Sequence, residues 1–256
     1  MSQASEAQGP VKKVAYIGLG NAGYPLASTL SKAGYKLVVR DVDAARAHQF
    51  AKEHDAATAV DAKDGEAFSD VDMVITMLPN GEIVRDVLLG SNGIAKHLRD
   101  GTIVVDTSSS SPFHTQETGR MLADLKSPLT LIDSPITQEY QYALAKGEAT
   151  LMVGCSNPEA LKRARPVLET MGKYVFDMGE LGSGHAMKTL NNYSSAASIL
   201  GLCDALMAGQ KFGLDPAKMV DVMNVGTGVN FSTKESFRTD VGRKIRRGWA
   251  VFFFCS

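Results

Sequence analysis

The stretch VAYIGLGNAGYPLASTL, residues 14–30, passes from a run of strand-forming residues through three glycines into a helical pattern. Gly18, Gly20 and Gly23 have the G-x-G-x-x-G spacing of a dinucleotide-binding turn. In such a turn the first glycine permits a tight bend, the second lets a pyrophosphate approach the backbone, and the third lets the helix pack against the strand. We therefore predict that a strand, a phosphate-binding loop and a helix follow one another here.

The surroundings of these glycines separate a phosphate-binding loop from an ordinary glycine-rich turn. A strand precedes them, a helical segment follows, and a second apolar run ends at Asp41. This order favours a cofactor site, in which free N–H groups at the start of the helix face the phosphates. The predicted cofactor-binding residues of the loop are Gly18, Leu19, Gly20, Asn21, Ala22 and Gly23.

Asp41 bears on the choice between NAD and NADP. A carboxylate at the end of the second strand accepts hydrogen bonds from the adenosine ribose and repels a phosphate there, which favours NAD. The neighbouring Arg40 offers a guanidinium that can bind the 2′-phosphate of NADP, or that simply lies in solvent. NAD is the predicted cofactor, and NADP stays open.

Strand-like runs recur along the first part of the chain. They lie at residues 14–17, 36–39, 73–76, 102–105, 129–132, 150–153 and 174–176. Helical patterns separate most of them, and two of these patterns end at Gly34 and Gly172, which can take the left-handed conformation. The alternation predicts an α/β fold, a Rossmann-type doubly wound and mostly parallel sheet over residues 12–180.

A helical pattern without strand signals begins at Ser183 and reaches Gly213. Its apolar stripe is Tyr193, Ala196, Leu200, Cys203 and Met207. Asp215 can then cap a further helix whose first turn holds Pro216. Residues 181–240 are thus predicted to be all-helical.

Composition limits the partners. The 27 basic and 28 acidic side chains nearly cancel, so no overall field attracts nucleic acid or a membrane, and a small molecule is expected instead. The three cysteines, Cys155, Cys203 and Cys255, suit neither a disulfide framework nor a zinc cluster, so we expect a reducing cytoplasm and no metal. Residues 1–11 resemble no targeting signal and are predicted to be a disordered start.

Two loops follow predicted strands at the sheet edge where such folds bind ligands, TMLPNGE at residues 76–82 and DTSSSSP at residues 106–112. Pro79 can hold apolar groups beside a ring, and the hydroxyls of Ser108 and Ser109 can donate to a ribose or a carboxylate. Each loop alone also fits an ordinary connection, with a serine and a proline starting a helix. Their shared location favours the cofactor interpretation.

The segment GSGHAMKTLNN, residues 182–192, places Lys188 and Asn192 four residues apart on one helical face, with glycines that leave room for a ligand. A single helical lysine is more often a solvated charge. This helix, however, starts where the nucleotide-binding domain ends, and oxidation of an alcohol needs a base that burial can make from a lysine. Lys188 is therefore the candidate catalytic residue, and Asn192 a candidate substrate ligand.

The chain resembles the β-hydroxyacid dehydrogenases, which include 3-hydroxyisobutyrate dehydrogenase. The motifs that carry the resemblance are GLGNAGYPLASTL, MLP at 77–79, DTSSSSP and GSGHAMKTLNN. The resemblance implies NAD(P)-dependent oxidation of a small 3-hydroxy acid or related alcohol. It also implies that Lys188 is the general acid/base, that Asn192 contacts substrate, and that Leu78, Pro79 and Ser109 line the cofactor. With the resemblance, residues 181–240 are expected to form a partial helical domain for substrate binding and dimerisation, and we expect a homo-oligomer through the helix at 183–212.

The substrate loop departs from the family, because Thr137, Gln138 and Glu139 replace its S-G-G. Ser108 and Thr137 are the remaining candidate substrate contacts, while the bulkier and acidic residues put the family's usual substrate in doubt. The family's helical domain also continues further than this chain, so we expect a truncated product with an atypical tail at 241–256. The alternative function is a dinucleotide-binding protein that has lost turnover.

Overall fold

The computed structural model describes residues 9–61, 64–137 and 141–236. The chain divides into two compact units, Met1–Lys188 and Thr189–Ser256, and the boundary falls inside the long helix α7, Ser183–Lys211. Val11 is buried against the core, whereas residues 1–8 of the predicted disordered start and the predicted tail at 241–256 lie outside the described residues.

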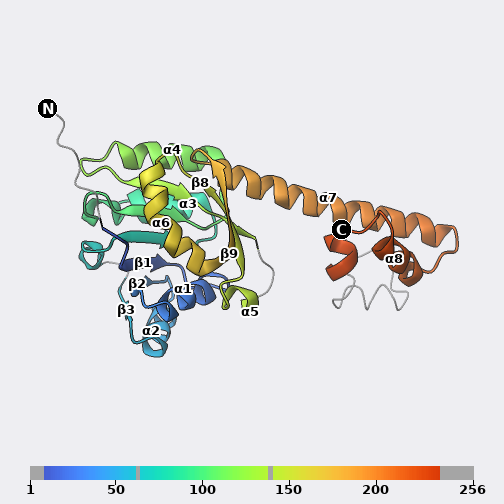
Figure 1. Ribbon diagram of the computed structural model, residues 1–256, viewed down its shortest axis with the longest axis horizontal. Coiled ribbons are helices and arrows are strands. Elements are labelled where there is room, and N and C mark those ends of the chain that lie inside the picture. The colour runs from blue at the N-terminus through green and yellow to red at the C-terminus, as the bar shows by residue number, and fades with distance from the viewer. Residues whose placement is uncertain (1–8, 62–63, 138–140, 237–256) are drawn as a thin grey trace. The chain divides into compact units, whose positions relative to one another are not determined.

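The first unit alternates strands and helices (Figure 1). Its strands are β1 Lys13–Ile17, β2 Lys36–Arg40, β3 Ala57–Ala59, β4 Met73–Thr76, β5 Ile103–Asp106, β6 Thr130–Asp133, β7 Ile136–Thr137, β8 Ala149–Gly154 and β9 Gly172–Gly179. Its helices are α1 Gly23–Lys32, α2 Ala44–Glu53, α3 Gly81–Leu89, α4 Pro112–Ala123, α5 Gln141–Leu144 and α6 Pro158–Met171. The predicted strands are confirmed; β3 and β7, each three residues or shorter, were not predicted.

The strands form one sheet in the order β3-β2-β1-β4-β5-β6-β8-β7, with β9 paired to β8. The first six of these run parallel, and β8 is antiparallel to β6 and β7. The strand order changes direction between β1 and β4, where a doubly wound sheet leaves a crevice at the carboxyl ends of its strands. The predicted Rossmann-type, mostly parallel sheet is thus confirmed.

Alternate residues of the strands enter two separate cores. In β1, Tyr16 joins the core beneath α1, α2 and α6, while Ala15 joins the core beneath α3 and α4. Successive side chains of a strand point to opposite faces, so helices on both faces require strands that are apolar throughout. This requirement explains the continuous apolar runs in the sequence.

Gly172 corrects one detail of the sequence analysis. It follows α6 with an extended conformation, φ −140°, and it already begins β9, so it is not a left-handed helix end. A β-carbon at Gly172 would overlap Leu151 and lie 2.8 Å from the carbonyl oxygen of Ala149. The glycine therefore permits the close pairing of β9 with β8, whereas Gly34 has the expected positive φ of 89°.

The second unit contains the rest of α7 and the helix α8, Pro216–Val225. The Asp215 carboxylate caps α8 by accepting from Ala217 N at 2.9 Å, as predicted. Leu202, Leu206 and Val220 are buried together. The predicted apolar stripe of α7 is not its buried face. Three large side chains of that stripe, Tyr193, Leu200 and Met207, are exposed, whereas Leu202 and Leu206 are buried.

In the described part of the chain, no helix is both long enough and apolar enough to cross a lipid bilayer.

Candidate active site

The glycine loop joins β1 to α1 in the way that the sequence predicts. Gly18 has a φ of +98°, and a β-carbon there would overlap the carbonyl of Met77 at the end of β4. A β-carbon on Gly23 would overlap the carbonyl oxygen of Gly18, whereas one on Gly20 would meet nothing within 4 Å. Gly18 and Gly23 thus allow close packing, and Gly20 leaves the backbone open to a ligand.

The first turn of α1 offers a backbone donor to an anion. Ala22 stands at the cap position without a side-chain hydrogen bond. Tyr24 N donates to the Gly20 carbonyl oxygen at 3.0 Å and Pro25 has no N–H, so Gly23 N–H is the donor that faces a ligand there. Because the start of a helix carries the positive end of its dipole, this group suits a pyrophosphate. The residues present therefore fit a dinucleotide.

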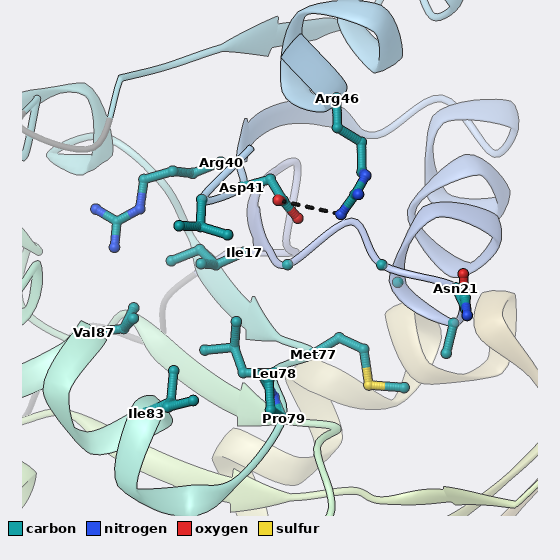
Figure 2. A pocket seen from close by; sticks show the side chains of 15 residues that line it. Ile17, Asn21, Arg40, Asp41, Arg46, Met77, Leu78, Pro79, Ile83 and Val87 are labelled. Carbon is teal, nitrogen blue, oxygen red and sulfur yellow. Dashed lines mark hydrogen bonds and ion pairs between the residues drawn. The ribbon is translucent and has the colours of Figure 1, made fainter. Parts of the chain in front are cut away.

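A cavity of about 650 Å³ opens beside this loop (Figure 2). It is lined by Ile17, Gly18, Gly20, Asn21, Ala22, Gly23, Arg40, Asp41, Val42, Arg46, Met77, Leu78, Pro79, Ile83 and Val87. The structure thus brings together most of the residues predicted to bind the cofactor. Leu19 is the exception within the loop, since its side chain is buried and it lines a neighbouring hollow.

The Asp41 carboxylate is held against the glycine loop. Its Oδ2 accepts from Leu19 N at 2.6 Å and its Oδ1 accepts from Asp43 N at 2.9 Å. Arg46, in the first turn of α2, approaches the same carboxylate, with Nη1 3.4 Å from Oδ1 (Figure 2). A phosphate at this place would meet a fixed negative charge.

Arg40 does not lie in solvent, because it is 8% exposed, and it lines the cavity, so its contact with a 2′-phosphate stays a prediction. Its guanidinium lies over the Phe68 ring, 5.5 Å from the ring centre, and its side chain extends away from Asp41 in Figure 2. Arg46 is the arginine beside Asp41, and sequence reasoning missed it. The sequence could have indicated Arg46, because a residue in the first turn of the helix after β2 lies close to the end of that strand.

The two predicted loops are joined to each other by Ser108. Its hydroxyl oxygen accepts from Leu78 N at 2.9 Å, which ties the loop after β5 to the loop after β4. Ser108 is buried and Ser109 is exposed. Ser109 is not among the residues that line the cavity, so its predicted cofactor contact stays a prediction. Ser108 connects the two loops, and its predicted substrate contact also stays a prediction.

The start of α7 is capped by a residue from the sheet. Asp133, the last residue of β6, accepts from Gly182 N and from His185 N, each at 2.7 Å. A β-carbon on Gly184 would overlap the Met152 carbonyl oxygen and lie 2.8 Å from the Asp133 carboxylate. Gly184 therefore makes room for the sheet, which corrects the expectation that this glycine leaves room for a ligand.

Lys188 lies one turn further along α7 and is half-buried. Burial lowers the pKa of its amine from the usual 10.5, because the charged form loses solvent. A lysine of this kind can accept and return a proton closer to neutral pH. Thr137 lies half-buried on β7, and Asn192 lies on α7 in the second unit, so their predicted substrate contacts stay predictions.

Comparison with known proteins identifies the family. Residues 13–179 match the NAD binding domain of 6-phosphogluconate dehydrogenase, and residues 182–254 match the NAD-binding domain of NADP-dependent 3-hydroxyisobutyrate dehydrogenase. A 3-hydroxyisobutyrate dehydrogenase of Pseudomonas aeruginosa is 34% identical over 223 residues, which are 86% of this chain and 71% of that protein. The chain belongs to the β-hydroxyacid dehydrogenase family.

Two further comparisons, one of sequence and one of structure, find dehydrogenases or reductases of small hydroxy acids and aldehydes. A 3-sulfolactaldehyde reductase of Escherichia coli is 34% identical over 75% of this chain and 64% of its own length. The structure of a Mycobacterium tuberculosis 3-hydroxyisobutyrate dehydrogenase with L-serine superposes with a TM-score of 0.77 at 29% identity, covering 88% of this chain and 74% of that one. The chain is thus an NAD(P)-dependent oxidoreductase of the hydroxy acid dehydrogenase type. Its match to the human mitochondrial 3-hydroxyisobutyrate dehydrogenase covers 62% of that protein's length.

Proposed function

We propose that the chain binds NAD along the glycine loop and oxidises a small 3-hydroxy acid, or reduces the matching aldehyde, with Lys188 as the general acid/base. One observation carries the proposal. Lys188 is half-buried with a lowered pKa, on a helix whose first turn is fixed to the carboxyl end of β6. Proton transfer by such a group typically contributes a factor of about 10² to 10⁴ in rate.

Lys188 acts on the hydroxyl proton of the substrate. In oxidation the neutral amine accepts that proton, and in reduction the ammonium group returns it to the carbonyl oxygen. The bound dinucleotide supplies the hydride acceptor or donor. Ser109 and the Leu78–Pro79 segment would hold the cofactor, and Asn192, Thr137 and Ser108 would contact the substrate.

The substrate class follows from the named relatives. Two of them are named for 3-hydroxyisobutyrate and 3-sulfolactaldehyde, and the Mycobacterium tuberculosis structure contains L-serine. Each of these compounds is a three-carbon chain with an alcohol or aldehyde at one end and an anionic group, so we propose a substrate of this size and charge. Thr137 belongs to the loop that differs from the family, so we expect the preferred anionic group to differ as well.

We further propose that the partner of α7 is a second copy of the chain, because Tyr193, Leu200 and Phe212 expose apolar surface along it or just beyond its end. The near balance of 27 basic and 28 acidic residues disfavours nucleic acid as a partner. The widely spaced cysteines favour the cytoplasm as the location.

Turnover on a panel of substrates tests the proposed function. The purified chain is mixed with NAD and with 3-hydroxyisobutyrate, L-serine, glycerate or a simple secondary alcohol, and NADH formation is followed by absorbance. We expect turnover with at least one three-carbon 3-hydroxy acid and little with the secondary alcohol. NAD binding by calorimetry without turnover on any member of the panel would favour the alternative, a dinucleotide-binding protein without catalysis.

A further inference from the structure

The first unit buries a cluster of ionisable side chains that the proposed proton transfer does not use. Asp106, Asp133 and His185 are each at most 2% exposed. The His185 ring lies between the two carboxylates, with Nε2 3.8 Å from Asp106 Oδ2 and Nδ1 3.7 Å from Asp133 Oδ2. Burial of three ionisable groups costs free energy unless each one is compensated by partners. The partners of His185 show what this arrangement achieves.

The two ring nitrogens of His185 have different kinds of partner. Nε2 lies 3.0 Å from the carbonyl oxygen of Ser108, and since a carbonyl only accepts, Nε2 carries a hydrogen and donates it. Nδ1 lies 2.7 Å from the hydroxyl of Thr115, which also lies 3.1 Å from the carbonyl oxygen of Ser111. The one hydroxyl hydrogen can go to either acceptor. Whether the His185 ring is neutral or charged, Nε2 must carry a hydrogen to bond the Ser108 carbonyl. Nδ1 can either accept a hydrogen from the Thr115 hydroxyl or donate one to it.

Ser108, in the loop after β5, connects this imidazole to the loop after β4, which lines the cavity. Its N–H donates to Asp106 Oδ1 at 3.0 Å, its hydroxyl oxygen accepts from Leu78 N, and its carbonyl accepts from His185. Leu78 lines the cavity. A short chain of hydrogen bonds thus runs from the cavity wall to the first turn of α7, and Lys188 lies three residues beyond His185 on that helix.

We propose that His185 is a positioning residue for proton transfer. Its Nε2 bond to the Ser108 carbonyl fixes the first turn of α7, and with it Lys188, relative to the loop after β5 and, through Ser108, to the loop after β4 that lines the cavity. His185 itself contacts neither substrate nor cofactor in this role. The inference rests on the proposed acid/base function of Lys188, and it matters because a misplacement of about 1 Å can lower a rate by about 10²-fold.

Two amide substitutions separate the two ring nitrogens. The side-chain nitrogen of glutamine reaches the place of Nε2, and that of asparagine reaches the place of Nδ1. His185→Gln therefore keeps an N–H donor to the Ser108 carbonyl. His185→Asn keeps an amide nitrogen near the Thr115 hydroxyl but loses the donor to Ser108. We expect kcat within about threefold of the wild type for His185→Gln and about 10- to 100-fold lower for His185→Asn, with the Kd for NAD unchanged in both.

A merely structural role predicts a different result, because each variant loses one of the two ring contacts. Equal kcat values for the two variants, whether both normal or both low, would overturn the proposal. Thr115→Val is the matched control, since it removes the Nδ1 contact, together with the hydroxyl's bond to the Ser111 carbonyl, and leaves the Nε2 bond in place. It should change kcat by less than threefold. If His185→Asn does not fold, Thr115→Val decides the question, and a tenfold loss of kcat in that variant would contradict the role of Nε2.

A readout without turnover keeps this test separate from the proposed function. Reductive methylation with ¹³C-formaldehyde labels the lysine amines, and Lys188→Ala identifies the Lys188 signal for a pH titration. The pKa of Lys188 should stay low in His185→Gln and return toward 10.5 in His185→Asn. Equal titration in the two variants rejects the positioning role even if Lys188 is catalytic. Normal turnover of Lys188→Ala rejects the proposed function, whatever the titration shows.

Discussion

Lys188 determines the expected pH dependence. Burial lowers the pKa of its amine, so the neutral base is present at lower pH than for an exposed lysine. In the oxidative direction kcat/KM should rise with pH and level off above the lowered pKa, and in the reductive direction it should fall over the same range. Rates measured from pH 6 to 11 in both directions check this. Parallel profiles in the two directions would contradict proton transfer by Lys188.

Asp41 and Arg46 together determine the cofactor preference. NAD should bind more tightly than NADP, because the fixed Asp41 carboxylate repels a 2′-phosphate and occupies Arg46. Asp41→Asn removes the repulsion and one of the two carboxylates that pair with Arg46, the other being Asp43. The ratio of NADP to NAD affinity should therefore rise at least tenfold, an effect of about 1.4 kcal/mol. Calorimetric titration with both cofactors measures it.

Two controls identify the responsible arginine. Adding Arg46→Ala to Asp41→Asn should abolish the gain, whereas adding Arg40→Ala should preserve it, since Arg40 lies over Phe68. The opposite pattern would show that Arg40 binds the phosphate.

At the scale of elements, α7 depends on close contact between Gly184 and the sheet. Gly184→Ala should lower the free energy of unfolding of the first unit by more than about 2 kcal/mol, because its β-carbon would overlap Met152 and crowd Asp133. Gly201→Ala on the same helix meets no atom within 4 Å and should be neutral or stabilising by up to about 1 kcal/mol. Denaturant titrations compare the two, and equal effects would contradict the packing described for Gly184.

These elements also show how far sequence reasoning reaches. The turn of the glycine loop, the place of Asp41 after β2 and the place of Lys188 on α7 were predictable, since each depends on a local pattern of strand, turn and helix. The hydrogen bonds of His185 were not, because they join residues from three distant segments of the chain. Gly184 and Gly172 were misread for the same reason: local sequence shows the absence of a side chain, but not which neighbour fills the space.

At the scale of the whole chain, the exposed apolar side chains of α7 predict self-association. Leu200 is 60% exposed and Tyr193 is 74% exposed, and a buried partner surface would remove both from water. Leu200→Asp should therefore lower the apparent mass in light scattering, whereas Asp204→Asn on the same helix should leave it unchanged. A wild-type chain that is monomeric at micromolar concentration would contradict this prediction.

The most direct test of the account compares the wild-type chain with Lys188→Ala, using the best substrate from the panel. The predicted result is a fall in kcat of about 10² to 10⁴-fold, with the Kd for NAD changed by less than about threefold, because the dinucleotide binds at the glycine loop and Lys188 acts on the substrate. A Lys188→Ala variant that binds NAD and keeps the wild-type kcat would contradict the account.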